Sequence, residues 1–333
     1  MGSTPHARSL VDLADKVEVA YAYSPSEGRR RAFAEQFPFP LADSLETILD
    51  DKSVDGVLVV TPANTHREIA ERCAAAGKHV LLEKPVDITT AQAEAAVAAC
   101  RKAGVRLGIV LQHRFRPASV RLAEIIKGGE LGKLVGCSTV IRLWRPQSYY
   151  DEPGRGSFAR DGGGVLLSQG IHTLDLMLSL AGPVAEVTGF AATTSIHRME
   201  TEDMVVAAAR FANGALGTID ATTAAYPGFL ERIEMIGESG TATIMGTELL
   251  VQFHDGRQIG MKADGSAGGT GADPMAYPHD HHRAVMDDFI EAIRNDRDPR
   301  VTGEEALKVH RLIDALIETG KLGRPVPVAG AEA

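Results

Sequence analysis

Gly56-Val57-Leu58-Val59-Val60 is apolar from end to end, with no alternation between apolar and polar residues. Strands of a parallel sheet that is buried on both faces have this composition, so the stretch predicts such a sheet. Other apolar runs lie on either side of it, and amphipathic stretches between them predict crossover helices. Residues 1–118 are therefore expected to form a doubly wound α/β domain. The predicted strands are Val17–Tyr23, Gly56–Val60, His79–Leu82 and Leu107–Leu111, and the predicted helices are Glu27–Gln36, Thr65–Ala76 and Thr89–Ala103.

The pattern changes after about residue 118, where longer alternating stretches follow one another through turns such as Asn213-Gly214. This predicts an α+β domain over residues 119–333, with a large, mainly antiparallel open sheet. Two closing helices, His281–Arg294 and Gly303–Thr319, can pack back on the first domain, and Lys262–Pro278 is predicted to be a loop. The predicted strands are Val135–Trp144, Ala185–Thr194, Met204–Phe211, Ala215–Thr223, Glu231–Ile236 and Thr241–Ile244.

The composition is that of an ordinary globular protein, with 333 residues and a formal net charge of −9. The chain has no long basic run, which argues against a nucleic-acid partner. It also has no apolar run near the roughly 20 residues that cross a membrane. Cys73, Cys100 and Cys137 are widely spaced and form no CxxC pair. We therefore expect no disulfide and no zinc site, and a reducing cytoplasm as the compartment.

Two motifs carry candidate chemistry. Glu83-Lys84-Pro85 directly follows a predicted strand, which places a lysine where open α/β sheets bind ligands, at the carboxyl end of a parallel strand. The glycine-rich stretch Gly162-Gly163-Gly164 runs into a predicted amphipathic helix that carries His172 and Asp175. These two side chains are three residues apart and therefore share a helix face. Each motif alone is also compatible with a purely structural role.

Two further motifs complete a series: Thr61-Pro62-Ala63-Asn64-Thr65-His66, and Asp288-Phe289-Ile290-Glu291-Ala292-Ile293 near the C-terminus. In order and spacing the four motifs resemble the Gfo/Idh/MocA family, the group of glucose-fructose oxidoreductase and inositol dehydrogenase. The resemblance implies a Rossmann-like domain and an NAD(P)-dependent oxidoreductase. Its substrate would be a hydroxyl or carbonyl group of a sugar, an inositol or a nucleotide-linked sugar, and its assembly a homodimer or homotetramer. The alternative is a non-catalytic relative that binds a sugar or a partner in the same cleft.

By position, Lys84 resembles the family's catalytic lysine and His172 its active-site histidine. Oxidation of an alcohol needs a base for the hydroxyl proton and a cation near the developing alkoxide. A histidine with an unperturbed pKa of about 6.5 can take the proton near neutrality, and a lysine can do so if burial lowers its pKa. The sequence leaves the proton open between the two. The positions that resemble cofactor-side residues are Thr61, Pro62, Asn64, His66, Glu83 and Pro85.

The N-terminus departs from the family pattern. Family members begin with a strand and a GxGxxG-type turn, whereas this sequence opens with Met1-Gly2-Ser3 and a predicted first helix, Pro5–Leu13. We therefore expect an N-terminally truncated Rossmann-like domain in which Gly2 is the remnant of the glycine turn and a cofactor-binding residue. Because that turn supplies backbone N–H groups to the pyrophosphate, the chain as numbered is expected to bind nicotinamide cofactor weakly or not at all.

The residues after Val17–Tyr23 bear on the choice between the two nicotinamide cofactors. An acidic residue there would bind the ribose 2′-hydroxyl of NAD, but this sequence has Ser24, followed by Arg29 and Arg30. The loss of a carboxylate and the gain of arginine suit a 2′-phosphate, so NADP is preferred to NAD. The arginines are equally compatible with an ordinary helix surface.

A sugar site needs aromatic faces for C–H edges and fork-shaped donors for hydroxyls or carboxylates. Ser168 stands where many family members have an aspartate, and it can orient a substrate but carries no charge. His279, His281 and His282 lie too close in sequence to converge together on one ion, so no metal site is predicted. The candidate substrate residues are Arg114, Trp144, Arg145, Ser168, Gln169, Asp175 and His281.

Overall fold

The apolar stretch at residues 56–60 forms strand β1 (Gly56–Val59) of a three-stranded parallel sheet. Strands β2 (His79–Glu83) and β3 (Leu107–Val110) follow in the order β1-β2-β3, and β3 is buried along its whole length. The structure is a computed structural model that describes residues 3–263 and 279–331. The predicted Rossmann-like sheet is thus confirmed over three of its four predicted strands.

Helices α1 (Thr4–Asp12), α2 (Glu27–Ala34), α4 (His66–Ala75) and α5 (Thr90–Ala103) match the predicted helices within a few residues. Local signals explain their ends. In α5, for example, the Thr89 hydroxyl accepts a hydrogen bond from the Gln92 N–H, and Gly104 ends the helix in the left-handed conformation at φ +70°.

The predicted strand Val17–Tyr23 is wrong. In this segment only Ala22 forms a bridge, to Leu41, and the described residues contain no strand beside it. A strand exists only when a neighbour satisfies its backbone N–H and C=O groups, and an apolar pattern alone does not supply that neighbour. The short helix α3 (Leu45–Asp50) was not predicted.

The second part of the chain forms a nine-stranded sheet in the order β11-β10-β9-β8-β4-β7-β6-β5-β12. Neighbouring strands are antiparallel except β4 and β7, which are parallel, so the predicted mainly antiparallel sheet is confirmed. All six predicted strands are present, whereas β10 to β12 were not predicted. The strands are β4 (Leu134–Arg142), β5 (Val184–Ala192), β6 (Met204–Phe211), β7 (Leu216–Thr222), β8 (Arg232–Gly237), β9 (Gly240–Met245), β10 (Glu248–Phe253), β11 (Gln258–Met261) and β12 (Val326–Pro327).

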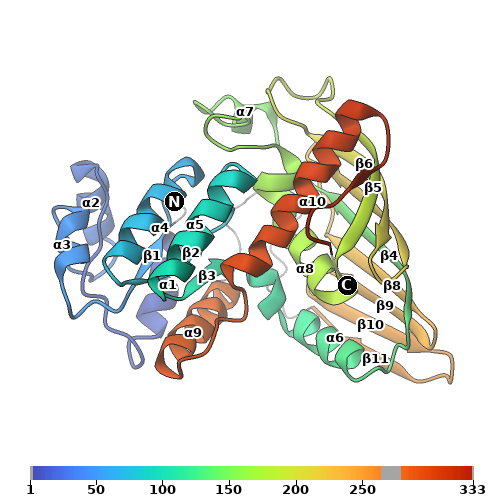
Figure 1. Ribbon diagram of the computed structural model, residues 1–333, viewed down its shortest axis with the longest axis horizontal. Helices are drawn as coiled ribbons and strands as arrows, with labels where there is room; N and C mark the ends of the chain where they lie inside the picture. The colour runs from blue at the N-terminus through green and yellow to red at the C-terminus, as the bar shows by residue number, and fades with distance from the viewer. Residues whose placement is uncertain (1–2, 264–278, 332–333) are drawn as a thin grey trace.

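Helices cover one face of this sheet. Helices α6 (Pro117–Lys127), α8 (Ile171–Ala181) and α10 (Gly303–Leu322) lie along the face that turns toward the first domain (Figure 1). Residues along β6 alternate between buried and exposed, as expected for a sheet covered on one side only. In the described parts of the chain no helix covers the opposite face (Figure 1).

Helix α9 (Asp280–Arg294) belongs to the C-terminal part of the sequence but packs on the first sheet and on α1. Phe289 lies so close to β3 that a Cβ at Gly108 would come within 2.8 Å of its ring. At the other end of α9, Asp12 accepts hydrogen bonds from His279 and Arg283. The last helices therefore join the two parts of the chain.

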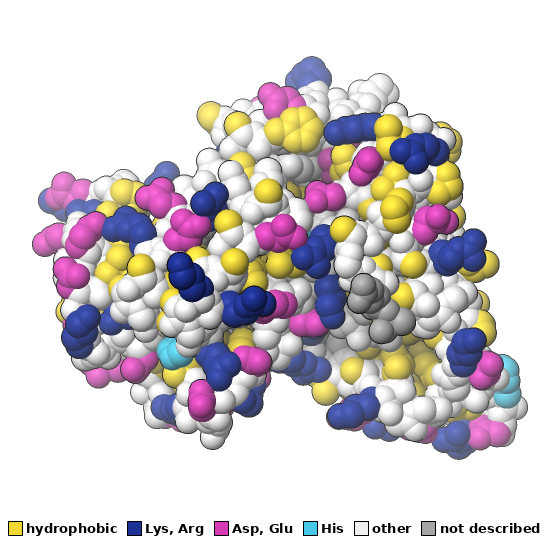
Figure 2. All heavy atoms as spheres, viewed as in Figure 1, with side chains coloured by type: hydrophobic (Ala, Val, Ile, Leu, Met, Phe, Trp, Pro, Cys, Tyr) yellow, Lys and Arg dark blue, Asp and Glu magenta, His cyan; other side chains and the backbone are white. Residues whose placement is uncertain are grey.

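Two further features concern the length of the helices and the charges on the surface. None of the helices in residues 3–263 and 279–331 is long and apolar enough to cross a membrane. Figure 2 shows acidic and basic side chains interspersed over the visible face of both domains. The predicted loop Lys262–Pro278 falls almost entirely outside the described residues, as does Gly2.

Candidate active site

The carboxyl ends of β1 and β2 are held together by His66. Its ring is buried, with Nδ1 2.9 Å from the Pro85 carbonyl oxygen and Nε2 2.9 Å from the Thr61 carbonyl oxygen. Both ring nitrogens are thus occupied by backbone groups of the two strand ends. His66 thus links the two strand ends, whereas Thr61 is partly buried and Asn64 is exposed.

Lys84 joins the two domains at the end of β2. Its Nζ donates a hydrogen bond of 2.6 Å to the Ser168 carbonyl oxygen, 84 residues further along the chain. The pKa of Lys84 is lowered chiefly by burial. The Glu83 carboxylate opposes this shift, and the charges of Arg155 and Arg145 add to it. A partly buried ammonium group with hydrogen-bonding capacity left after one carbonyl can donate to a substrate oxygen.

The glycine stretch brings Ser168 to Lys84. Gly162 has φ +74°, and a Cβ there would lie 2.4 Å from the Ile88 carbonyl oxygen. At Gly164 a Cβ would lie 1.7 Å from the Glu202 carbonyl oxygen, so no other residue fits without moving the backbone. The stretch continues into a π-helix, Val165–Gly170, and this irregular turn opens α8. Such turns are frequent at functional sites.

His172 lies in the first turn of α8, and its ring centroid is 5.0 Å from that of His113. Its Nδ1 is buried and has no hydrogen-bond partner among the described residues. Burial, and then the charge of Lys84, hold the pKa of His172 well below its usual 6.5. A neutral imidazole keeps a lone pair on one of its two ring nitrogens and can therefore accept a proton. The sequence led us to expect a pKa near neutrality for His172. Burial of the ring lowers that pKa, so the expectation is corrected.

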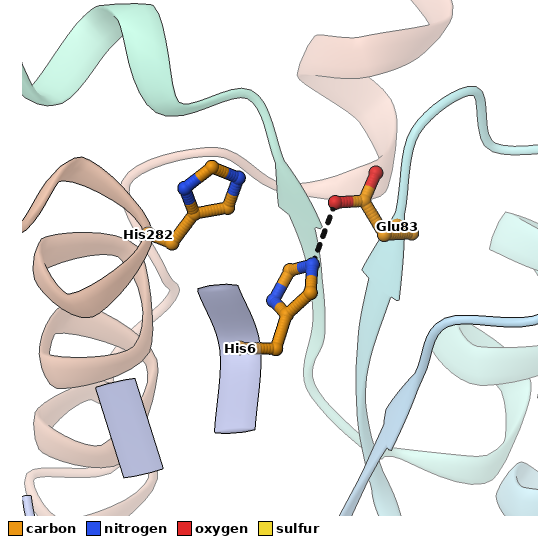
Figure 3. A group of neighbouring side chains, drawn as sticks. All are labelled: His6, Glu83 and His282. Atoms are coloured by element: carbon orange, nitrogen blue, oxygen red, sulfur yellow. Dashed lines mark hydrogen bonds and ion pairs between the residues drawn. The ribbon is translucent and has the colours of Figure 1, made fainter. Parts of the chain in front are cut away.

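Glu83 anchors a second group of side chains, in which α1 contributes His6 and α9 contributes His282 (Figure 3). The His6 Nε2 lies 2.9 Å from Glu83 Oε1, and the two imidazoles meet edge to face at 5.0 Å. Burial would raise the pKa of Glu83, but the hydrogen bond and charge of His6 and the charge of Lys84 lower it to about 2. Burial lowers the pKa of His282 to about 4.

These three residues are also the group that could hold a metal ion, because one potential ligand atom of each lies within 4.8 Å of the others. Two imidazoles and one carboxylate suit several divalent metals. The same contacts, one hydrogen bond between His6 and Glu83 and one ring contact between His6 and His282, also fasten α1 and α9 to β2. His281, the predicted substrate residue, is the neighbour of His282 and is partly buried.

Arg114 and Asp175, both predicted on the substrate side, bind each other. The Arg114 Nε and Nη2 donate to the two Asp175 carboxylate oxygens at 2.8 and 2.6 Å, and both side chains are buried. Arg114 also reaches Glu305 at 3.2 Å. The pair therefore ties the turn after β3 to α8 and α10. His172 and Asp175 belong to the same helix, but Asp175 pairs with Arg114 whereas the His172 ring lies beside that of His113.

The remaining predicted substrate residues are Trp144, Arg145, Ser168 and Gln169. Trp144 lies 5.5 Å from the Tyr226 ring, and the Arg145 Nη1 donates to the Trp144 carbonyl oxygen. The side-chain oxygen of Gln169 is buried without a partner among the described residues, and the Ser168 hydroxyl donates to the Gly163 carbonyl oxygen.

The residues predicted to decide between NADP and NAD lie in α2 and just before it. The Arg30 Nη1 donates to the Ser24 carbonyl oxygen, and its guanidinium lies 5.9 Å from the centroid of the Tyr23 ring. Arg29 is exposed. The chemistry of these side chains fits a dinucleotide: the Thr61 hydroxyl, the Asn64 amide and the guanidinium groups of Arg29 and Arg30 can donate hydrogen bonds, and the Glu83 carboxylate can accept them.

Three residues of the site were missed by the sequence analysis: His6, His113 and Arg155. His6 lies in the predicted first helix, and no motif in the sequence marked it. His113 directly precedes Arg114 at the end of β3, another strand end. Arg155 lies in a loop without periodicity, and only its neighbours in space reveal it.

A parallel sheet with a lysine at its carboxyl edge, closed by a glycine turn from an open-sheet domain, defines a two-domain dinucleotide-dependent oxidoreductase. Two domain models agree. The oxidoreductase family's NAD-binding Rossmann fold matches residues 1–110, and the GFO/IDH/MocA C-terminal domain matches residues 119–243. The chain belongs to the Gfo/Idh/MocA family of oxidoreductases.

Individual relatives cover nearly the whole chain. It is 28% identical over 313 residues to myo-inositol 2-dehydrogenase of Thermotoga maritima, covering 91% of this chain and 88% of the relative. It is 26% identical to scyllo-inositol 2-dehydrogenase (NAD(+)) of Bacillus subtilis, covering 90% and 86%. The WlbA dehydrogenase from Bordetella pertussis, solved with NADH and UDP-GlcNAcA, superimposes with a TM-score of 0.84 at 28% identity, covering 98% and 94%.

Proposed function

We propose that this oxidoreductase acts on a hydroxyl or carbonyl group of a sugar, an inositol or a nucleotide-linked sugar, with Lys84 and His172 acting on the reacting oxygen. The observation that carries the proposal is the junction at which Lys84 Nζ meets the Ser168 carbonyl at 2.6 Å, with His172 in the following helical turn. The inositol dehydrogenases among the relatives and the sugar nucleotide bound by the WlbA dehydrogenase support the substrate class.

Lys84 and His172 have separate roles in the proposed reaction. A nicotinamide cofactor, when bound beside Lys84, would supply hydride transfer to or from the reacting carbon. The Lys84 ammonium donates to the substrate oxygen and stabilises negative charge that develops on it. The neutral imidazole of His172 takes the hydroxyl proton in the oxidation direction and returns it in the reduction direction. The cation beside His172 opposes a second positive charge, which keeps the imidazole ready to accept.

For the cofactor we propose NADP, with NAD as the second choice. The support is the absence of a carboxylate at Ser24 and the orientation of Arg30, which is held against the Ser24 carbonyl and the Tyr23 ring. A guanidinium fixed in this way can pair with a 2′-phosphate. Neighbours that bind NADH, such as the WlbA dehydrogenase, show that the fold also accepts the other cofactor.

We also propose a homodimer or homotetramer that buries the open face of the large sheet. Phe190 and Val206 are paired across β5 and β6 on this face and are 78% and 49% exposed. Leu216 and Ile236 flank Gly136 in the same sheet and are likewise exposed. Apolar side chains grouped in this way mark an association surface.

The test of the proposed function is Lys84→Met, with Lys102→Met, an exposed lysine at the end of α5, as its control. Because Met removes the cation beside the reacting oxygen, kcat should fall by about a hundredfold or more, whereas the control should keep the wild-type rate. The rate is measured as reduction of the cofactor, followed by the absorbance of the reduced nicotinamide, over a panel of sugars and inositols. A Lys84→Met enzyme within about threefold of wild type contradicts the role.

The pH dependence should follow the lowered pKa of His172. In the oxidation direction kcat/KM should be constant while the imidazole is neutral and should fall only below pH 6.5, as the pH drops through the lowered pKa. His172→Asn should lose about a hundredfold or more in rate and lose this acidic limb. A limb centred at or above pH 6.5, or one that persists in the variant, assigns the proton elsewhere.

The cofactor proposal predicts that Arg30→Gln raises KM for NADPH about tenfold or more and leaves KM for NADH unchanged, because only NADPH offers a 2′-phosphate. Arg31→Gln is the matched control, since Arg31 lies in the same helix and pairs with Glu27. Kinetics with both cofactors measure the difference. An equal effect of Arg30→Gln on the two cofactors refutes this reason for the preference.

The sheet interface predicts that Phe190→Lys combined with Val206→Lys lowers the molar mass of the assembly measured by light scattering. Two charges on the apolar face oppose its burial. Val11→Lys, on an exposed position of α1, is the control and should leave the mass unchanged. A monomeric wild-type protein at micromolar concentration disproves the proposed assembly.

A further inference from the structure

The ring of His172 has no hydrogen bond that holds its direction. Its Nδ1 is buried without a partner, and in the described ranges, 3–263 and 279–331, no group donates to or accepts from either ring nitrogen. A histidine that transfers a proton in an enzyme is usually oriented by a hydrogen bond between its other ring nitrogen and a fixed group. The plane of this imidazole therefore depends on the side chains that pack against it.

The ring that lies beside it is that of His113. The two ring centroids are 5.0 Å apart, and the ring planes are tilted by 32°. Aromatic rings that pack together have centroids about 4.5 to 7 Å apart, so this is a direct contact. His113 is buried and lies in the short 3₁₀ helix Gln112–Phe115 that follows β3. The contact thus joins the carboxyl end of β3 to the start of α8.

Arg116 decides which nitrogen of His113 carries the proton. The Arg116 Nη2 is hydrogen-bonded to the His113 Nε2. Because a guanidinium group can only donate, Nε2 must accept, and the ring is neutral with its proton on Nδ1. The same guanidinium donates from Nη1 to the Gly246 carbonyl oxygen at 3.2 Å and lies 3.6 Å from the Glu231 carboxylate. Turns at the end of the large sheet therefore hold His113 through Arg116.

We propose that His113 is a positioning residue that fixes the plane of the His172 ring for proton transfer, and that Arg116 keeps His113 neutral and in one orientation. The inference rests on the proposed function, in which His172 takes the hydroxyl proton. That transfer needs a ring nitrogen within hydrogen-bond reach of the substrate hydroxyl. A neutral neighbour also suits His172, because a charged ring at this distance would oppose the imidazolium that forms when the proton arrives.

The first test compares His113→Ala with His113→Phe on a sugar or inositol that the wild-type enzyme oxidises. Because the His172 ring loses its neighbour, His113→Ala should lower kcat about tenfold or more and leave the substrate KM within about threefold of wild type. His113→Phe supplies an aromatic face again and should recover part of the lost rate. His254→Ala, at an exposed histidine that follows β10, is the control and should keep the wild-type rate.

A double-mutant cycle separates positioning from a general effect on the fold. A residue that acts only through His172 has nothing left to position once that imidazole is gone. In the His172→Asn background, His113→Ala should therefore change kcat by less than about twofold, although it costs about tenfold or more in the wild-type background. Thermal unfolding checks that each variant is folded.

The tautomer of His113 is measured without cofactor or turnover. Proton–nitrogen correlation spectra distinguish an imidazole that is protonated at Nδ1 from one that is protonated at Nε2. The spectrum of His113→Phe identifies the signal of His113 among the 11 histidines, because that signal alone disappears. We expect a neutral ring with its proton on Nδ1.

Four results would each overturn the inference: a wild-type rate in His113→Ala, a loss that appears in KM instead of kcat, an equal loss in both backgrounds, or a His113 ring protonated at Nε2. Each of them leaves the proposed function standing as long as His172→Asn is impaired. If His172→Asn keeps the wild-type rate, the proposed role of His172 fails and the inference fails with it.

Discussion

The close packing of a glycine turn against two backbone carbonyls determines the rest of this structure. At Gly162 and Gly164 even a single Cβ would collide with the carbonyl oxygens of Ile88 and Glu202. Because these positions have no side chain, the turn can press the start of α8 against the carboxyl end of β2. Lys84 then reaches the Ser168 carbonyl, and the two domains meet at this hydrogen bond.

Burial at this junction changes the proton affinities of its side chains. Burial lowers the pKa of both Lys84 and His172, and the lysine charge lowers that of the histidine further. The same combination of burial and neighbouring cations lowers the pKa of His113. A cation and a neutral imidazole can therefore stand side by side, which is the pairing that alcohol oxidation requires. Glu83 stays charged because His6 and Lys84 surround it.

Much of this fold could be predicted from local patterns, and the errors have physical causes. Apolar periodicity and turn residues located the helices and most strands, because both act over a few neighbouring residues. Val17–Tyr23 has the composition of a strand, but only Ala22 is paired, with Leu41, and composition cannot supply further partners. In the site, Lys84 and His172 were predicted and lie at one junction. Arg114 and Asp175 were predicted for substrate but bind each other.

By itself the sequence determined the two-domain α/β and α+β architecture, the strand end that carries Lys84 and the glycine turn that precedes His172. Only the tertiary structure decided which groups these residues face. Lys84 and Ser168 are 84 residues apart, Arg114 and Asp175 are 61 apart, and His6 and Glu83 are 77 apart. Hydrogen-bond partners and proton affinities depend on distance in space and on the exclusion of water, and neither is encoded in the local pattern of a single segment.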